Sequence, residues 1–160
     1  MATPLLLQAE HVAKAYAGVP ALRDGRLSLR AGSVHALCGG NGAGKSTFLS
    51  ILMGITQRDA GTILLNGTPV QFNRPSEALA AGIAMITQEL EPIPYMTVAE
   101  NIWLGREPRR AGCIVDSKTL NRRTRELLES LEFEVDATSP MHRLSVAQIQ
   151  LVEIAKAFSH

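Results

Sequence analysis

The 160-residue sequence has little cysteine, almost no net charge and no long apolar run, and each of these features excludes a class of protein. Its two cysteines, Cys38 and Cys113, lie far apart, and its four histidines show no metal-ligand spacing, so neither a disulfide framework nor a zinc site is predicted. No stretch of roughly 18 apolar residues occurs, so no membrane span is expected. The net charge of +1 gives no support for a nucleic-acid partner, and Arg109-Arg110 and Arg122-Arg123 are interpreted as solvated surface.

The first residues also lack the pattern of a secretory signal. Residues 1–5 contain neither a basic region nor a long apolar stretch, and they predict the beginning of an ordinary strand. We therefore expect an intracellular protein. With 46% hydrophobic residues, the chain can bury the core of about one domain.

What the sequence does contain is a glycine-rich loop. Residues 39–46 fit the phosphate-binding motif G-x-x-x-x-G-K-[ST] at every fixed position. Residues 33–38 predict a buried strand before it, and residues 45–53 predict a helix that ends before Gly54. Glycine permits backbone angles that let successive N–H groups converge on phosphate oxygens. The predicted nucleotide contacts are Gly39, Gly40, Asn41, Gly42, Ala43, Gly44, Lys45, Ser46 and Thr47.

The chemistry of this loop predicts how a nucleoside triphosphate is held. A helix dipole contributes only about 0.3–1 kcal/mol, whereas each hydrogen bond to a charged group contributes roughly 1.5–3 kcal/mol. We therefore expect Lys45 and the converging amides to dominate phosphate binding. Ser46 is placed to ligate a magnesium ion.

The remaining pattern predicts a strand-rich first part. Residues 5–12 and 27–29 favour an antiparallel sheet. Residues 62–70 predict a hairpin around Asn66-Gly67, because this pair suits a tight turn with positive φ. A helix is expected over 76–81 and an apolar strand over 83–87.

Beyond residue 90 the pattern becomes helical. Residues 97–100 fit a capping box, and Asp116 and Ser145 are predicted to cap two further helices. The helix after Asp116 is expected to place four leucines on one face, namely Leu120, Leu127, Leu128 and Leu131.

Three further features narrow the class of nucleotide-binding protein. They are Tyr16 upstream of the loop, Gln88 at the end of the predicted strand, and the run Leu-Ser-Val-Ala-Gln at residues 144–148. In this order and spacing they resemble the nucleotide-binding domain of ABC transporters. The resemblance covers essentially all 160 residues, and the phrases at 41–47 and 151–157 look most like ATP subunits of bacterial monosaccharide importers.

The resemblance implies a role for each of these features, with ATP and Mg²⁺ as cofactors. Tyr16 would stack on the adenine ring, and the Gln88 amide oxygen would reach the magnesium, together with Ser46, or the attacking water. The signature residues would contact the γ-phosphate of nucleotide held by a partner domain, and they are Ser145, Val146, Ala147 and Gln148. The implied partners are a second ATP-binding domain in a sandwich dimer and membrane permease subunits. The implied location is the inner face of the cell membrane, as a peripheral cytoplasmic subunit.

The sequence departs from the family pattern in two ways. Ala147 stands where the signature usually has a second glycine, a change that need not abolish phosphate contact if its φ is negative. No apolar strand ending in Asp-Glu follows the signature, so the residues that support magnesium and polarise water are not found. We therefore expect a truncated fragment that binds nucleotide, does not hydrolyse it alone, and associates with itself through an unpaired sheet edge near residues 34–38.

The predicted fold is α/β, a P-loop NTPase core of ABC type with an antiparallel β lobe and a helical insertion, truncated before the Walker B strand. The expected parts are an incomplete core over 1–90, a helical subdomain over 91–145 and a signature helix over 146–160. Two other functions stay open at this point. One is a non-catalytic nucleotide-binding or regulatory module, and the other is a soluble ABC protein.

Overall fold

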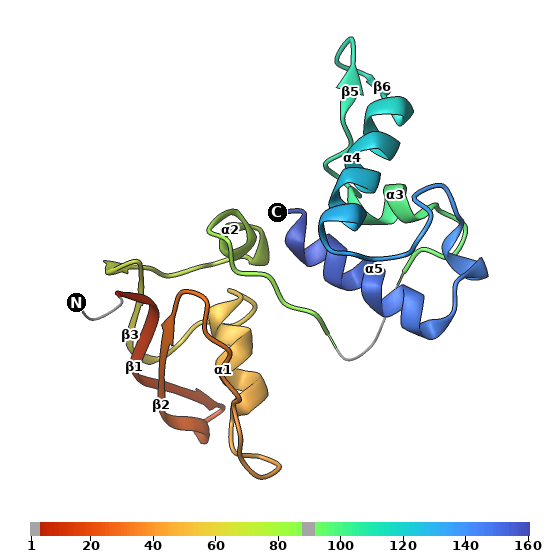
Figure 1. Cartoon of the computed structure of the whole chain (residues 1–160). Helices are drawn as coiled ribbons and strands as arrows, with labels where there is room; N and C mark the ends of the chain where they lie inside the picture. The colour runs from red at the N-terminus through yellow and green to blue at the C-terminus, as the bar shows by residue number, and fades with distance from the viewer. Residues whose placement is uncertain (1–3, 88–91) are drawn as a thin grey trace. The chain divides into compact units, whose positions relative to one another are not determined.

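The computed structural model describes residues 4–87 and 92–160, and the chain forms two compact units (Figure 1). The sheet unit comprises residues 1–83, and the helical unit comprises residues 84–160. Over the described ranges, no helix combines the length and the apolar character needed to cross a bilayer.

The sheet unit is built on four antiparallel strands in the order β2-β1-β3-β4. They are β1 (Leu5–Tyr16), β2 (Val19–Arg30), β3 (Ala60–Leu65) and β4 (Thr68–Pro69). The predicted antiparallel sheet is confirmed, although β1 and β2 are longer than expected because they pair with each other as far as the Tyr16–Val19 register.

Two positions show why this sheet needs particular residues. Asn66 and Gly67 have φ of 51° and 76°, the left-handed pair that a tight β3–β4 turn requires, so the predicted hairpin is confirmed. Opposite a bulge in β1, Gly61 has φ +92°, and a Cβ there would overlap the His11 carbonyl. Only glycine fits this close approach of two backbones.

The core of the sheet unit lies between β1, β3 and α1 (Lys45–Leu52). Alternate residues of β1 point to this side, so Leu7 and Ala9 are buried with Ile63 of β3. Phe48 and Ile51 of α1 pack against them, and each such burial contributes about 1.5–3 kcal/mol.

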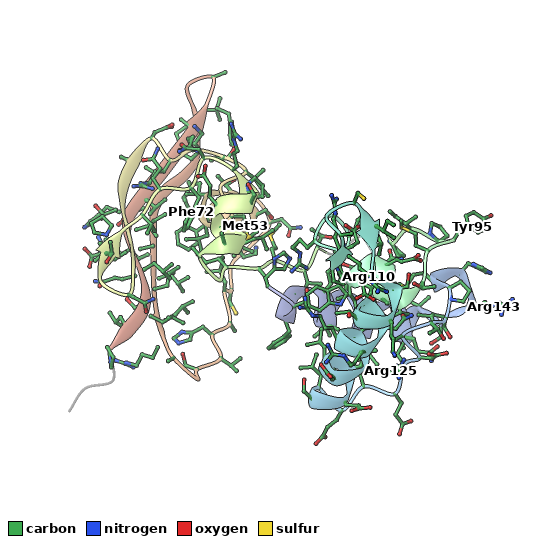
Figure 2. The ribbon with its side chains drawn as sticks, turned by 90° about the horizontal axis from the view of Figure 1, so that it is seen from above. Met53, Phe72, Tyr95, Arg110, Arg125 and Arg143 are labelled. Carbon is green, nitrogen blue, oxygen red and sulfur yellow. The ribbon has the colours of Figure 1, made fainter. Side chains whose placement is uncertain are left out.

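After α1 the chain turns at Gly54, whose φ is +68° and whose missing Cβ makes room for Phe72. Figure 2 places the Met53 and Phe72 side chains in the same part of the sheet unit. The helix predicted over 76–81 is confirmed as α2 (Pro75–Ala80).

Two predicted strands are absent, and these predictions were wrong. Residues 33–38 and 83–87 have no regular structure, and Val34 is 100% exposed while Ile86 is 48% exposed. The physical reason is that an apolar strand of this type is buried only between neighbouring strands, and no strand of the described residues pairs with either segment.

Over residues 92–160 the helical unit contains three α-helices, one 3₁₀ turn and a small hairpin. They are α3 (Val98–Ile102), α4 (Ser117–Ser130), η1 (Met141–Arg143), α5 (Val146–Phe158), β5 (Arg109–Arg110) and β6 (Ile114–Val115). All three predicted caps are confirmed. Thr97 and Ser145 form capping boxes with Glu100 and Gln148, and the Asp116 carboxylate accepts a hydrogen bond from the Thr119 amide.

The core of this unit joins its three helices. Val98 and Ile102 of α3, Leu128 of α4, and Val152 of α5 are all buried in one cluster. The predicted leucine face of α4 is confirmed, because Leu120 and Leu128 are buried and the other two leucines are half-buried against the core.

Candidate nucleotide-binding site

The glycine-rich loop leads directly into α1. Gly42 and Gly44 have φ of 80° and 84°, so both adopt the left-handed backbone conformation that glycine permits. Gly44 stands at the N-cap of α1, and no side chain caps the helix there. The amides of its first turn are therefore left to a ligand, and no acidic side chain in that turn repels an anion.

The loop is fixed on one side and open on the other. A Cβ at Gly44 would lie 2.6 Å from the Ala21 carbonyl oxygen of β2, so the loop is pressed against the sheet at this point. Positions 40 and 42, in contrast, face open space. The Lys45 ammonium donates to the carbonyls of Gly39 at 2.6 Å and Gly40 at 2.9 Å. An ammonium has three donors, so one remains for a phosphate oxygen.

A hollow of about 490 Å³ opens over the loop. It is lined by Ala21 and residues 41–47, a set with a lysine and two hydroxyls but no carboxylate. This donor set fits a polyphosphate, because every charged or polar group that it offers can donate to an anion or ligate a cation bound to one. A larger hollow of about 600 Å³ lies around Leu6, Gln8 and Leu64, and it contains none of the predicted site residues.

Ser46 is the predicted magnesium ligand that lies among the described residues. It is in the first turn of α1, and it lines the hollow. Mg²⁺ takes oxygen ligands and accepts several from phosphates and water, so a Ser46 hydroxyl fits as a single protein ligand. The other predicted ligand, Gln88, lies outside the described residues.

Tyr16 is the last residue of β1, at the end of the β1–β2 hairpin that also carries Ala21. Its side chain is 48% exposed, and its hydroxyl lies 3.4 Å from the Thr56 hydroxyl. The Lys14 ammonium lies over the ring, 5.6 Å from the ring centroid. The sheet unit therefore contains both the phosphate loop and a half-exposed aromatic ring.

The structure also reveals two residues that the sequence analysis missed. Lys14 donates to the Asp59 carboxylate at 2.7 Å, and this carboxylate also accepts from the Ala15 amide at 2.8 Å. These bonds hold the pKa of Asp59 below its usual value, with the hydrogen bond from Lys14 as the largest cause. No sequence signal could have found the pair, because its members belong to no motif and lie far apart in the chain.

The signature residues lie in the helical unit, at the beginning of α5. The Ser145 hydroxyl accepts from the Gln148 amide, while the Gln148 side chain accepts from the Ser145 amide. Ala147 lies in α5, so its φ is negative. A negative φ is the condition under which an alanine at this position need not abolish phosphate contact. Ser145, Val146 and Ala147 are exposed.

The surface beside the signature carries an aromatic pair. The Tyr95 ring lies 5.5 Å from the His142 ring, centroid to centroid, and Tyr95 is 87% exposed. Tyr95 and Arg143 lie at one end of the helical unit in Figure 2. Across residues 4–87 and 92–160, no cluster of His, Cys, Asp and Glu side chains could hold a metal ion.

Comparison with known proteins gives consistent results. The family model for the ABC transporter matches residues 22–160. A putative ribose/galactose/methyl galactoside import ATP-binding protein of Pseudomonas syringae pv. syringae (strain B728a) is 52% identical over 157 residues, covering 98% of this chain and 30% of the relative. The protein of the same description in Halalkalibacterium halodurans is 51% identical and covers 99% of this chain and 31% of its own length. The chain thus spans about 30% of the curated relatives that it matches.

Solved structures of similar fold are ATP-binding cassettes of ABC transporters. One, in an ADP conformation, has a TM-score of 0.81 and 26% identity, covering 96% of this chain and 64% of that chain. A nucleotide-free cassette has a TM-score of 0.80 and 25% identity over the same shares. The match over residues 22–160, the open phosphate hollow and the uncapped α1 agree, and the chain belongs to the ABC transporter family.

Proposed function

We propose that the chain is the ATP-binding part of an importer subunit that couples ATP hydrolysis to the uptake of a sugar. The observation that carries the proposal is the open hollow over residues 41–47, whose described lining includes Lys45 and no carboxylate. The sugar class is supported by relatives of about 50% identity that are described as ribose/galactose/methyl galactoside import proteins.

Within this proposal, ATP binds with its phosphates over residues 39–47 and its adenine on Tyr16. When bound, Mg²⁺ screens the phosphate charge. Ser46 would hold the ion, together with Gln88 in the role predicted for it from the sequence. Lys45 keeps one donor for a phosphate oxygen while its other two stay on the loop carbonyls. Because residues 41–47 and Ala21 include no carboxylate, the lining formed by these residues adds no like-charge repulsion with ATP.

The signature residues Ser145, Val146, Ala147 and Gln148 act on the nucleotide of a second ATP-binding domain. Their exposure at an α5 N-terminus supports this role, since the Ser145 side chain and the helix dipole both favour an anion. We propose a sandwich dimer, membrane permease subunits as further partners, and a peripheral position at the cytoplasmic face of the membrane. The division into parts at residues 90 and 145 remains a proposal.

We propose that these 160 residues bind ATP without turning it over. Phosphoryl transfer depends on positioned water and stabilised charge, and the described residues that line this hollow include no carboxylate that could position water. This is tested by comparing ATP hydrolysis by residues 1–160 with ATP hydrolysis by a longer protein of the same family. Turnover by the 160-residue chain itself would contradict it.

The import function is tested in cells. Replacing the chromosomal gene with one encoding Lys45→Ala is expected to abolish uptake of labelled ribose or galactose while the protein is still produced. Uptake of a sugar that enters by another route serves as the control. Unchanged uptake of every sugar would reject the importer assignment, while ATP binding by the purified chain would then favour a nucleotide-binding regulatory module.

A further inference from the structure

The loop after α1 is tied to the end of β1 mainly by Asp59. The Asp59 amide donates to the Ala13 carbonyl at 2.9 Å, and its carboxylate accepts from Lys14 at 2.7 Å and from the Ala15 amide at 2.8 Å. Asp59 therefore contacts three successive residues of β1. The Lys14 side chain is 16% exposed and the Asp59 side chain is 48% exposed, so the lysine is partly shielded from water while the carboxylate is open to it.

These contacts end immediately before Tyr16. The loop that carries Asp59 and Thr56 follows α1, and α1 begins at Lys45 in the phosphate loop (Figure 1). Asp59 thus joins the end of β1 to the same helix that presents the phosphate loop. Asp59 therefore fixes the backbone immediately before Tyr16 relative to this helix, whereas the direct contact of the Tyr16 hydroxyl with Thr56 is long at 3.4 Å.

Lys14 has a second role in the arrangement. Its ammonium lies over the Tyr16 ring, 5.6 Å from the centroid, and is held there by the Asp59 carboxylate. A cation over a ring is attracted to its π face, which favours one orientation of that ring. With the ring 48% exposed, a nucleobase can still stack on it.

We propose that Asp59 is a positioning residue for nucleobase binding. Through Lys14 and the Ala15 amide it orients the Tyr16 ring for stacking on the adenine of ATP. This inference rests on the proposed nucleotide-binding function and adds a residue that contacts neither phosphate nor base. It predicts that loss of the Asp59 carboxylate weakens binding of the base while leaving binding of the phosphates intact.

The test compares two ligands by calorimetry on the 160-residue chain, MgATP and inorganic triphosphate with magnesium. Asp59→Ala is expected to raise the Kd for MgATP roughly three- to tenfold, bounded by the loss of one aromatic stacking contact. The Kd for triphosphate is expected to stay within about twofold, because the loop at 39–47 is unchanged. The Asp59 amide bond to Ala13 remains in this variant, and retained triphosphate binding shows that the site is folded.

Glu10→Ala is the matched control. Glu10 is an exposed carboxylate on the same strand, and its side chain accepts a hydrogen bond from Gln8. Both substitutions remove one negative charge, which by itself favours an anionic ligand. Weaker MgATP binding by Asp59→Ala but not by Glu10→Ala therefore cannot come from net charge.

A double-mutant cycle identifies the route of the effect. If Asp59 acts through Tyr16, then Asp59→Ala has no further effect on MgATP binding in a Tyr16→Ala background. Equal weakening in both backgrounds, or equal weakening for MgATP and triphosphate, would overturn the inference while leaving the nucleotide-binding function standing. Failure of the unmodified chain to bind either ligand would overturn the proposed function, and this inference with it.

Discussion

At the residue scale, the glycines of the phosphate loop look equivalent in sequence but differ in structure. Gly44 has φ +84° and lies against the Ala21 carbonyl, whereas Gly40 has no left-handed φ and faces open space. A left-handed conformation costs an L-residue roughly 1–2 kcal/mol, and a steric overlap with backbone adds to this.

These two glycines therefore provide a matched pair. We expect Gly44→Ala to lower the free energy of unfolding by about 2–4 kcal/mol in urea, from combined strain and overlap. Gly40→Ala is expected to change it by less than about 0.5 kcal/mol, as for an open surface position. Equal destabilisation by the two substitutions would show that the loop is not packed against β2 as described.

Lys45 carries the main charge of the phosphate hollow. Lys45→Ala is expected to weaken ATP binding by a factor of roughly ten or more, because about 1.5–3 kcal/mol of charge-assisted hydrogen bonding is lost. Calorimetry measures this directly. Lys118→Ala, at an exposed position of α4 in the helical unit, changes net charge equally and should leave the affinity almost unchanged. An unchanged Kd for Lys45→Ala would contradict the assignment of the loop.

At the scale of elements, α3 depends on one buried amide. Asn101 is 2% exposed, and its side chain accepts from the Ile93 amide at 2.8 Å and donates to the carbonyls of Ile93 at 3.2 Å and Thr97 at 3.0 Å. This amide holds the segment before α3 against the helix. Burial makes each of these bonds costly to lose, since an unsatisfied backbone group then remains without water.

We expect Asn101→Ala to lower the free energy of unfolding by about 2–4 kcal/mol, through three lost hydrogen bonds and a small cavity. Asn121→Ala is the control, because Asn121 lies on α4 and is only half-buried. Chemical denaturation of both variants tests the difference. A cost below about 1 kcal/mol for Asn101→Ala would mean that water replaces the lost partners.

The N-cap of α4 makes the helical unit sensitive to acid. Hydrogen bonds from the Thr119 amide and hydroxyl hold the pKa of Asp116 below its usual value. The ionised cap therefore stabilises the folded state above the pKa of the carboxyl in the unfolded chain, which is about 4. This contribution is lost as the pH falls through the lowered folded pKa. Asp136 behaves in the same direction, because the Thr138 amide and hydroxyl lower its pKa.

Melting temperatures between pH 7 and pH 3 test this behaviour. Asp116→Asn keeps a capping side chain but removes the titrating group, so its melting temperature is expected to fall less between the two pH values than that of the unmodified chain. An identical fall in both proteins would show that Asp116 does not contribute to the acid response.

At the scale of the whole molecule, the exposed apolar segment at 33–38 predicts self-association. Val34 is 100% exposed and Leu37 is 41% exposed, in a stretch that pairs with no strand of the described residues. Light scattering of the 160-residue chain at high concentration is expected to show species larger than a monomer. Val34→Asp should reduce them, whereas Ile114→Asp, a change at an exposed isoleucine of β6, should not. A single monomer peak for the unmodified chain would refute the prediction.

Features that depend on interactions between residues close in the sequence were predicted correctly, and features that depend on distant residues were not. Caps and tight turns were predicted correctly at Thr97, Asp116, Ser145 and Asn66, because each depends on residues within one turn of the chain. The strands at 33–38 and 83–87 failed because their burial depends on neighbours that local sequence does not encode. The role of Asp59 was missed for the same reason, because its partner Lys14 lies far from it in the sequence.

The central position of β1 also determines how quickly the sheet unit can form. β1 pairs with β2 through a short turn, but its other edge pairs with β3, where Leu7 meets Leu65, only after a long loop has closed. Loop closure lowers chain entropy by an amount that grows with the logarithm of loop length, so such pairings slow folding. In the helical unit the caps span three residues, and α4 packs on α3 through nearer contacts such as the Trp103–Thr124 hydrogen bond, whose residues are 21 apart in the chain. In a refolding experiment followed by pulsed hydrogen exchange, the amides of α4 should therefore become protected before those of β3.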